Sequence, residues 1–154
     1  PRQFSNPDNI ECHFKTTGIE IIKEMLELSA FIAGSGTGGT IMGVNKVLKL
    51  MKSKAKVIQV QPEESNATHG IQGINDGEDF LLDKSILDET IYIKTKDAIA
   101  RAKRLAKENG LLVGISAGAN VLAAERWVAE NNPEHPVVTI LCDRGERYFS
   151  CYED

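Results

Sequence analysis

The sequence has few cysteines, no long apolar run and no block of one charge, and each shortage excludes a class of protein. Cys12, Cys142 and Cys151 are odd in number and widely spaced, which indicates free thiols in a reducing compartment rather than a disulfide framework. Because no apolar run reaches transmembrane length, we expect a cytoplasmic protein without a membrane partner. The 18 basic and 22 acidic residues give a net charge of −4 without a basic cluster, which argues against a nucleic-acid partner. The three histidines are isolated along the chain, so we expect no metal site.

Size and composition indicate a single globular domain. The chain has 154 residues, of which 42% are apolar and 26% charged, and this is enough for one hydrophobic core. The chain opens on Pro1, and residues 1–10 resemble a loop from the middle of a protein rather than a signal peptide. We expect one domain over residues 1–154. The sequence leaves open whether this domain is a fragment, a processed half or a short protein.

The most informative stretch is a glycine-rich turn at residues 34–40, the first glycine turn. An apolar run at residues 29–33 leads into it, and a helical pattern leads out of it. A strand, a glycine turn and a helix in this order aim backbone N–H groups and the positive end of a helix dipole at one point. Glycines let the backbone approach an anion closely, and threonines add hydroxyl donors. We therefore predict a phosphate site in this turn, with its glycines approaching the anion and Thr37 and Thr40 adding hydroxyl donors.

The same turn leaves a dinucleotide site open as an alternative. Gly34, Gly36 and Gly39 fit the spacing G-x-G-x-x-G of dinucleotide-binding domains. Such a site needs an acidic residue about 20 positions further on, at the end of the next strand. The next predicted strand, residues 56–61, ends in Gln59 and Gln61 instead. This difference weakens the dinucleotide alternative without removing it.

Short apolar strand patterns alternate with longer helical patterns along the rest of the chain. Beyond the first glycine turn, the patterns predict strands at residues 56–61, 90–94 and 137–142, an apolar run at residues 111–113, and helices at residues 95–109 and 114–132. Before it, residues 11–15 read as a short extended piece, and Thr16 or Thr17 reads as the N-cap of a helix. The strand patterns are nearly continuous in apolar residues, as in sheets that are covered on both faces. The predicted fold class is α/β, with a parallel sheet and helices on both faces.

Three polar loops are predicted to meet at one edge of this sheet. The first glycine turn, a second glycine turn at residues 114–119, and Asp143 all follow apolar strand patterns. In parallel sheets the carboxyl ends of the strands lie at the same edge, where ligands bind. Residues 63–89 form the longest region without periodicity. This region is either a solvated connection or a ligand-facing loop.

Together these motifs resemble the C-terminal half of a cysteine synthase (O-acetylserine sulfhydrylase), a pyridoxal-phosphate enzyme of fold type II. The matching segments follow the order of the family nearly from end to end and lie at residues 3–7, 16–18, 36–40, 70–74, 114–119 and 142–148. Each motif is weak by itself, whereas this many in the right order are specific. The last segment, CDRGERY, is closer to the cysteine synthase B branch. The resemblance implies the large α/β domain of such an enzyme.

The resemblance also implies roles for individual residues. Residues 36–40 would hold the phosphate of pyridoxal 5'-phosphate, and Ser116 would form a hydrogen bond with the nitrogen of its ring. A plain helix N-cap is the alternative role for Ser116. Gln3 and Gly73 would contact the amino-acid substrate. The whole enzyme would replace the activated hydroxyl of O-acetylserine, or a similar activated serine, by a sulfur donor to give cysteine, and would be a homodimer.

One part of the family pattern has no counterpart in this chain. The lysine that forms the Schiff base with the cofactor belongs to the N-terminal half of the family, and no lysine here lies in its sequence context. We therefore expect no catalytic residue in this chain and no turnover by the chain alone, with the missing half on the same or a second polypeptide. A Rossmann-like dinucleotide-binding module and a non-catalytic, lysine-less partner subunit are the alternatives.

Overall fold

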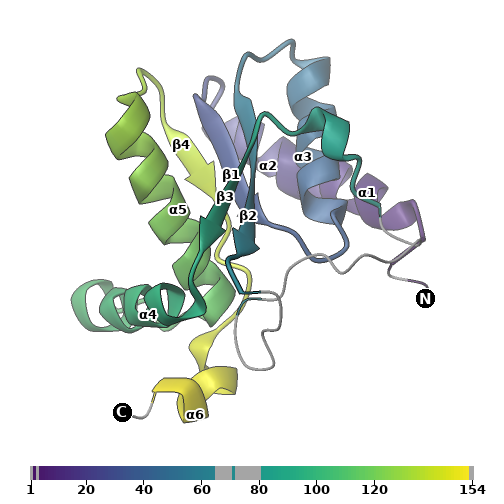
Figure 1. Ribbon diagram of the computed structural model, residues 1–154. Helices are drawn as coiled ribbons and strands as arrows, with labels where there is room; N and C mark the ends of the chain where they lie inside the picture. The colour runs from purple at the N-terminus through teal and green to yellow at the C-terminus, as the bar shows by residue number, and fades with distance from the viewer. Residues whose placement is uncertain (1, 3, 65–70, 72–80, 153–154) are drawn as a thin grey trace.

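A four-stranded parallel sheet forms the centre of the computed structural model, which describes residues 2, 4–64, 71 and 81–152 (Figure 1). Its strands are β1 (Ala30–Gly34), β2 (Lys56–Pro62), β3 (Glu89–Ile93) and β4 (Val137–Thr139), in the order β3-β2-β1-β4. Strand β1 pairs in parallel with both β2 and β4, with Ile32 opposite Ile58 and Thr139. The predicted parallel α/β fold is confirmed.

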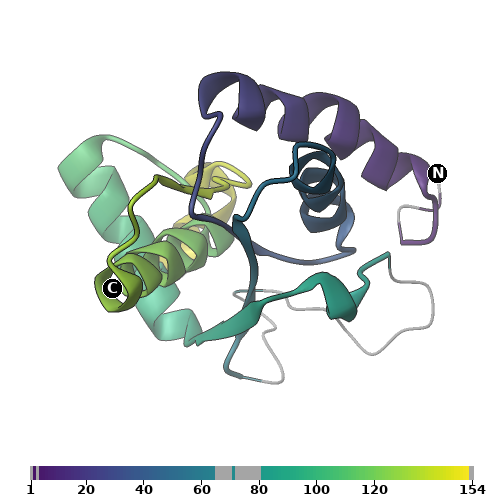
Figure 2. The same cartoon turned by 90° about the horizontal axis from the view of Figure 1, so that it is seen from above.

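Helices lie on both sides of the sheet, as Figure 2 shows from above. On one side lie α1 (Asp8–His13), the π-helical turn η1 (Phe14–Gly18), α2 (Ile19–Glu24) and α3 (Gly39–Leu50). On the other side lie α4 (Thr95–Asn109) and α5 (Ile115–Asn131). The short helices are η2 (Lys84–Ile86), η3 (Gly145–Tyr148) and α6 (Phe149–Tyr152). None of the helices within the described ranges is long and apolar enough to span a membrane.

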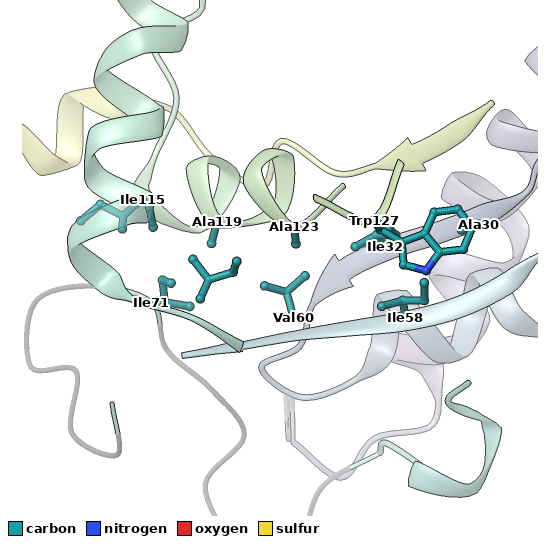
Figure 3. Close-up of a cluster of buried hydrophobic side chains, with 11 residues drawn as sticks. Ala30, Ile32, Ile58, Val60, Ile71, Ile115, Ala119, Ala123 and Trp127 are labelled. Carbon is teal, nitrogen blue, oxygen red and sulfur yellow. The ribbon is translucent and has the colours of Figure 1, made fainter. Parts of the chain in front are cut away.

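The core is divided between the two faces because side chains alternate along each strand. Phe31 and Ala33 of β1 belong to the cluster that packs against α3. Ile32, between them, belongs to the cluster on the opposite face, which includes Ala119 and Trp127 of α5 (Figure 3). Strand β1 is therefore buried on both faces, as its continuous apolar pattern predicted, whereas β3 at the edge of the sheet leaves Glu89 and Tyr92 exposed.

The first helical segment differs from its prediction, because it begins at Asp8 rather than after Thr16 or Thr17. The predicted extended piece at residues 11–15 is therefore wrong. Both threonine hydroxyls form hydrogen bonds within the helix: Thr16 Oγ1 donates to the carbonyl of Cys12 at 2.8 Å, and Thr17 Oγ1 lies 2.9 Å from Nδ1 of His13. Hydroxyl groups that bond back along a helix allow threonine inside it, so the hydroxyl marks no N-cap here.

The segment from α1 to α2 runs alongside α3 at very close range. A Cβ placed on Gly43 of α3 would lie 2.6 Å from Cβ of His13, and a Cβ on Gly18 would lie 2.5 Å from Cγ2 of Val47. Packing at this distance is possible only because glycine has no side chain. The tertiary contact with α3 explains why the helix, whose N-cap is Pro7, begins nine or ten residues upstream of the predicted N-cap.

The other elements agree with the predictions apart from their ends. Gly110 adopts the left-handed conformation that ends α4, with φ of 68°. The apolar run at residues 111–113 forms only an isolated bridge between Val113 and Arg144. Strand β4 ends at Thr139 rather than Cys142. Of the irregular region at residues 63–89, residues 65–70 and 72–80 lie outside the described part.

Candidate functional site

Both glycine turns lie at the edge of the sheet where the strands end, as the arrowheads in Figure 1 show. The first connects β1 to α3, and the second opens α5. Asn120, which is fully buried on α5, links them. Its Oδ1 accepts a hydrogen bond from the N–H of Gly34 at 2.8 Å, and its Nδ2 donates to the carbonyl of Ile140 at 2.8 Å. One amide thus connects the ends of β1 and β4 with the beginning of α5.

The first glycine turn is open at Gly36 and closely packed at the two glycines that follow. Gly36 is exposed, and a Cβ placed on it would meet nothing within 4 Å. Gly38 is left-handed, with φ of 90°, a conformation that favours glycine. The first hydrogen bond of α3 runs from the N–H of Met42 to the carbonyl of Gly38 at 2.9 Å, and the N–H of Gly39 donates to Thr37 Oγ1. The N–H groups of residues 40 and 41 therefore precede the bonded part of the helix. These donors suit an anion such as phosphate.

The two threonine hydroxyls of this turn are held by the helix that begins at Asp8. Thr37 Oγ1 accepts hydrogen bonds from Asn9 Nδ2 at 3.1 Å and from the N–H of Gly39 at 3.4 Å. Thr40 Oγ1 lies 3.2 Å from Nε2 of His13. The structure thus places Asn9 and His13 against the predicted residues Gly36 to Thr40. The sequence did not predict these two supporting residues.

The local pattern did not indicate these supports, because residues 11–15 read as an extended piece rather than as part of a helix. A signal was present: Asn9, His13 and Thr17 are spaced at intervals of four, which places polar side chains on one face of a helix. Burial lowers the pKa of His13 below its usual value, because the charged imidazolium loses hydration. The ring is therefore neutral near pH 7.

The second glycine turn is packed around a carboxylate. The N–H of Gly114 donates to the carbonyl of Asp143 at 3.0 Å, and a Cβ on Gly114 would collide with Oδ1 of Asp143. Asp143 Oδ2 accepts a hydrogen bond from the hydroxyl of Tyr148 at 2.5 Å. Because this bond is lost when the phenol ionises, it raises the pKa of Tyr148 to about 12. Oδ1 of Asp143 is buried and has no hydrogen-bond partner among the described residues.

Ser116 is the second residue of α5 and is half-buried. Among the described residues, no hydrogen bond joins its hydroxyl to another group, and no side-chain bond caps the helix. The alternative role of Ser116 as an N-cap therefore finds no support, because Gly114 occupies the N-cap position. The arrangement leaves the Ser116 hydroxyl as a donor at the same sheet edge as the first glycine turn.

A polar cluster joins Ser35 of the first glycine turn to two glutamines of β2. Ser35 Oγ accepts hydrogen bonds from Gln59 Nε2 at 2.6 Å and from Gln61 Nε2 at 3.2 Å. These glutamines also line a cavity of about 430 Å³ over β2 and β3, which contains none of the predicted site residues. At the end of β2, where a dinucleotide site needs an acidic residue, Gln61 thus supports the turn through Ser35.

Two predicted site residues are not placed. Gln3 and Gly73 lie outside the described residues, so their predicted contacts with an amino-acid substrate stay predictions. Within the described ranges, no group of three or more histidine, cysteine, aspartate or glutamate side chains could hold a metal ion.

Comparison with known proteins identifies relatives over nearly the whole chain. Residues 1–143 match the model of a family described as pyridoxal-phosphate dependent enzyme. Cysteine synthase B from Campylobacter jejuni is 43% identical over 159 aligned residues, which cover 96% of this chain and 52% of that protein. A cysteine synthase from Staphylococcus aureus is 39% identical and is matched over 97% of this chain and 52% of its own length. The chain therefore spans about half the length of the curated relatives it matches.

A solved structure also matches nearly the whole of this chain but only about half of its own length. O-acetylserine sulfhydrylase isoform 3 from Entamoeba histolytica superposes with a TM-score of 0.86 and 36% identity, over 97% of this chain and 47% of that structure. Each of these proteins is a relative of this chain and about twice as long.

Proposed function

This chain belongs to the family of pyridoxal-phosphate-dependent enzymes, and we propose that it is the phosphate-binding, C-terminal half of a cysteine synthase. The observation that carries the proposal is the cluster of donors at residues 36–40, which lies in an α/β domain of the family. Residues 1–154 would form a single domain. The dinucleotide alternative is not favoured, because the family match covers the glycine turns and Gln61 occupies the position of the acidic residue.

The first glycine turn fits the phosphate of pyridoxal 5'-phosphate. The open space at Gly36 admits an anion, and the N–H groups at the beginning of α3 with the hydroxyls of Thr37 and Thr40 would bind it. When bound, the cofactor supplies an electron sink for breaking bonds at the amino-acid substrate. The residues of this turn would hold the cofactor by its charged end and fix its orientation.

Ser116 would donate a hydrogen bond to the ring nitrogen or accept one from it. A neutral hydroxyl does not hold that nitrogen in its protonated form as a carboxylate does. A serine at this position would therefore leave the ring a weaker electron sink, which would suit elimination of an activated side-chain oxygen. The unpartnered hydroxyl of Ser116 among the described residues supports this role.

The remaining components would come from outside the described part of the chain. The lysine that binds the cofactor covalently would belong to a half of the enzyme that this chain does not match. Gln3 and Gly73 would contact the amino-acid substrate, a sulfur donor would complete the reaction, and the whole enzyme would be a cytoplasmic homodimer. The chain alone would bind the cofactor non-covalently and would not turn over.

Equilibrium dialysis of the purified chain with pyridoxal 5'-phosphate, inorganic phosphate and NAD tests the proposal. We expect pyridoxal 5'-phosphate and phosphate to compete for one site, and NAD not to bind. Thr40→Val should weaken binding about tenfold through the loss of one charged hydrogen bond. Thr16→Val, whose hydroxyl bonds only within an exposed helix turn, is the matched control. Tight NAD binding without pyridoxal 5'-phosphate binding would contradict the proposal.

A further inference from the structure

The helix that runs from Asp8 to Glu24 contributes directly to the first glycine turn. Asn9 and His13 lie one helical turn apart and reach Thr37 and Thr40. Two glycines of α3 permit this approach, because a Cβ on Gly39 would collide with Asn9, and a Cβ on Gly43 would collide with His13. The contacts are therefore built into the packing of the two helices.

The bonding of Thr37 determines where its hydroxyl proton is available. A hydroxyl group has one proton to donate and two lone pairs that accept. The oxygen of Thr37 accepts from Asn9 Nδ2 and from the N–H of Gly39. Both bonds use its lone pairs, so its own proton remains available for an anion.

The direction of the bond at Thr40 depends on His13. A neutral imidazole has one N–H donor and one acceptor nitrogen. Its Nδ1 lies 2.9 Å from Thr17 Oγ1 and its Nε2 lies 3.2 Å from Thr40 Oγ1. If Thr17 donates to Nδ1, the proton is on Nε2 and is donated to Thr40. Thr40 then keeps its own proton for an anion, as Thr37 does.

The opposite tautomer gives the opposite result. With the proton on Nδ1, the Nε2 lone pair accepts the proton of Thr40, and the hydroxyl of Thr40 has nothing to donate. A phosphate dianion offers only acceptors near neutral pH. Only the tautomer protonated on Nε2 therefore makes both threonines of the turn donors.

We propose that His13 is a positioning residue for phosphate binding: Thr17 holds its Nε2-protonated tautomer, which turns the Thr40 hydroxyl toward the anion. This inference rests on the proposed function, since it assigns the support of the same phosphate site. Neither His13 nor Thr17 contacts the anion, and each acts through Thr40. Thr17 thus influences the affinity of the site from two hydrogen bonds away.

The tautomer is measured directly in the full chain by NMR of the imidazole nitrogens, without any ligand. The sequence has three histidines, and the His13→Gln variant assigns the signal. We expect a neutral ring with its proton on Nε2, and Thr17→Val should mix the tautomers. A ring protonated on Nδ1 overturns the inference and leaves the proposed function standing.

Binding of pyridoxal 5'-phosphate and inorganic phosphate by the same chain supplies the second readout. We expect Thr17→Val to weaken both ligands about fivefold, while Thr16→Val, the neighbouring threonine, and Thr17→Ser, which keeps the hydroxyl, bind as the wild type does. His13→Gln retains a donor near the position of Nε2 and should preserve most of the affinity, whereas His13→Leu should lose as much as Thr40→Val. Adding Thr40→Val to His13→Leu should cause no further loss.

The results separate the two proposals. If the wild type binds pyridoxal 5'-phosphate but Thr17→Val and His13→Leu, folded by circular dichroism, bind equally well, the inference is wrong and the proposed function stands. If the wild type binds neither ligand, both are overturned for this chain.

Discussion

The two glycine turns look alike in the sequence but are supported in different ways. Each follows an apolar run and opens a helix, α3 or α5. The first is open at Gly36, which has free space around it, whereas Gly38 packs against Leu82 and the threonines are held by side chains of another helix. The second is closed, with Gly114 against Asp143. The first turn thus exposes its backbone at Gly36, whereas the second turn is filled at Gly114 by groups of the protein itself.

The contrast shows that glycine serves two different purposes at one sheet edge. At Gly36 the missing side chain leaves room for a ligand. At Gly114 it leaves room for the protein itself, because Asp143 and Tyr148 occupy the space that a Cβ would need. Asn120 joins the two arrangements, since its amide binds Gly34 at the first turn while its helix begins at the second.

Among the predictions, the largest difference in the free energy of unfolding is expected between the variants Gly114→Ala and Gly36→Ala. The new methyl at position 114 would collide with Oδ1 of Asp143 and lie 2.7 Å from Cε2 of Tyr148, so it should destabilise the fold by about 3 kcal/mol. At position 36 the methyl meets nothing within 4 Å and should change stability by less than about 0.5 kcal/mol, while weakening phosphate binding. Urea unfolding of both variants measures the two changes in stability. Equal losses of stability would contradict the contrast between an open Gly36 and a packed Gly114.

Asn120→Ala tests the link between the turns. It leaves the N–H of Gly34 and the carbonyl of Ile140 without their partner, which should lower the free energy of unfolding by about 2 kcal/mol. Asn131→Ala, on the exposed end of the same helix, removes a bond to the carbonyl of Trp127 and should cost less than about 0.5 kcal/mol. A comparable loss in the two variants would show that Asn120 has no special role.

Tyr148 reports on the closed turn through its titration. Its pKa is raised to about 12 by the hydrogen bond to Asp143, whereas the unfolded chain ionises near its usual value of about 10. The bond therefore stabilises the fold below pH 10, and this stabilisation is lost as pH rises from about 10 to about 12. Ultraviolet absorbance of the phenolate follows the titration, and Tyr148→Phe should remove the ionisation step that occurs at the highest pH. The exposed Tyr92 supplies the matched control, Tyr92→Phe. A titration of Tyr148 near pH 10 would contradict the assigned bond.

The smallest expected effect concerns the support of the open turn. Burial lowers the pKa of His13, so the unfolded chain binds more protons than the folded chain just below about pH 6.5. Stability should therefore fall as the pH decreases through this range. His13→Gln should flatten the profile, and His135→Gln, at an exposed position, controls for the removal of a histidine. An unchanged profile in His13→Gln would show that other groups cause the loss.

The sequence by itself determined the α/β class and the location of both glycine turns. Strands buried on both faces are continuous in apolar residues, and glycines at a strand end are local signals, so neither depends on distant parts of the chain. The glycines and threonines at positions 36 to 40 are part of that local signal, whereas their binding of phosphate stays a prediction.

Only the tertiary structure decided how the turns are supported. Asn9 and His13 reach the first turn because the helix from Asp8 packs on α3, and this packing overrides the local appearance of Thr16 and Thr17 as caps. Asn120 meets Gly34 across 86 positions of sequence. Such contacts depend on which faces of the helices and strands pack together. A local pattern of polar residues does not identify the distant residue that each side chain will contact.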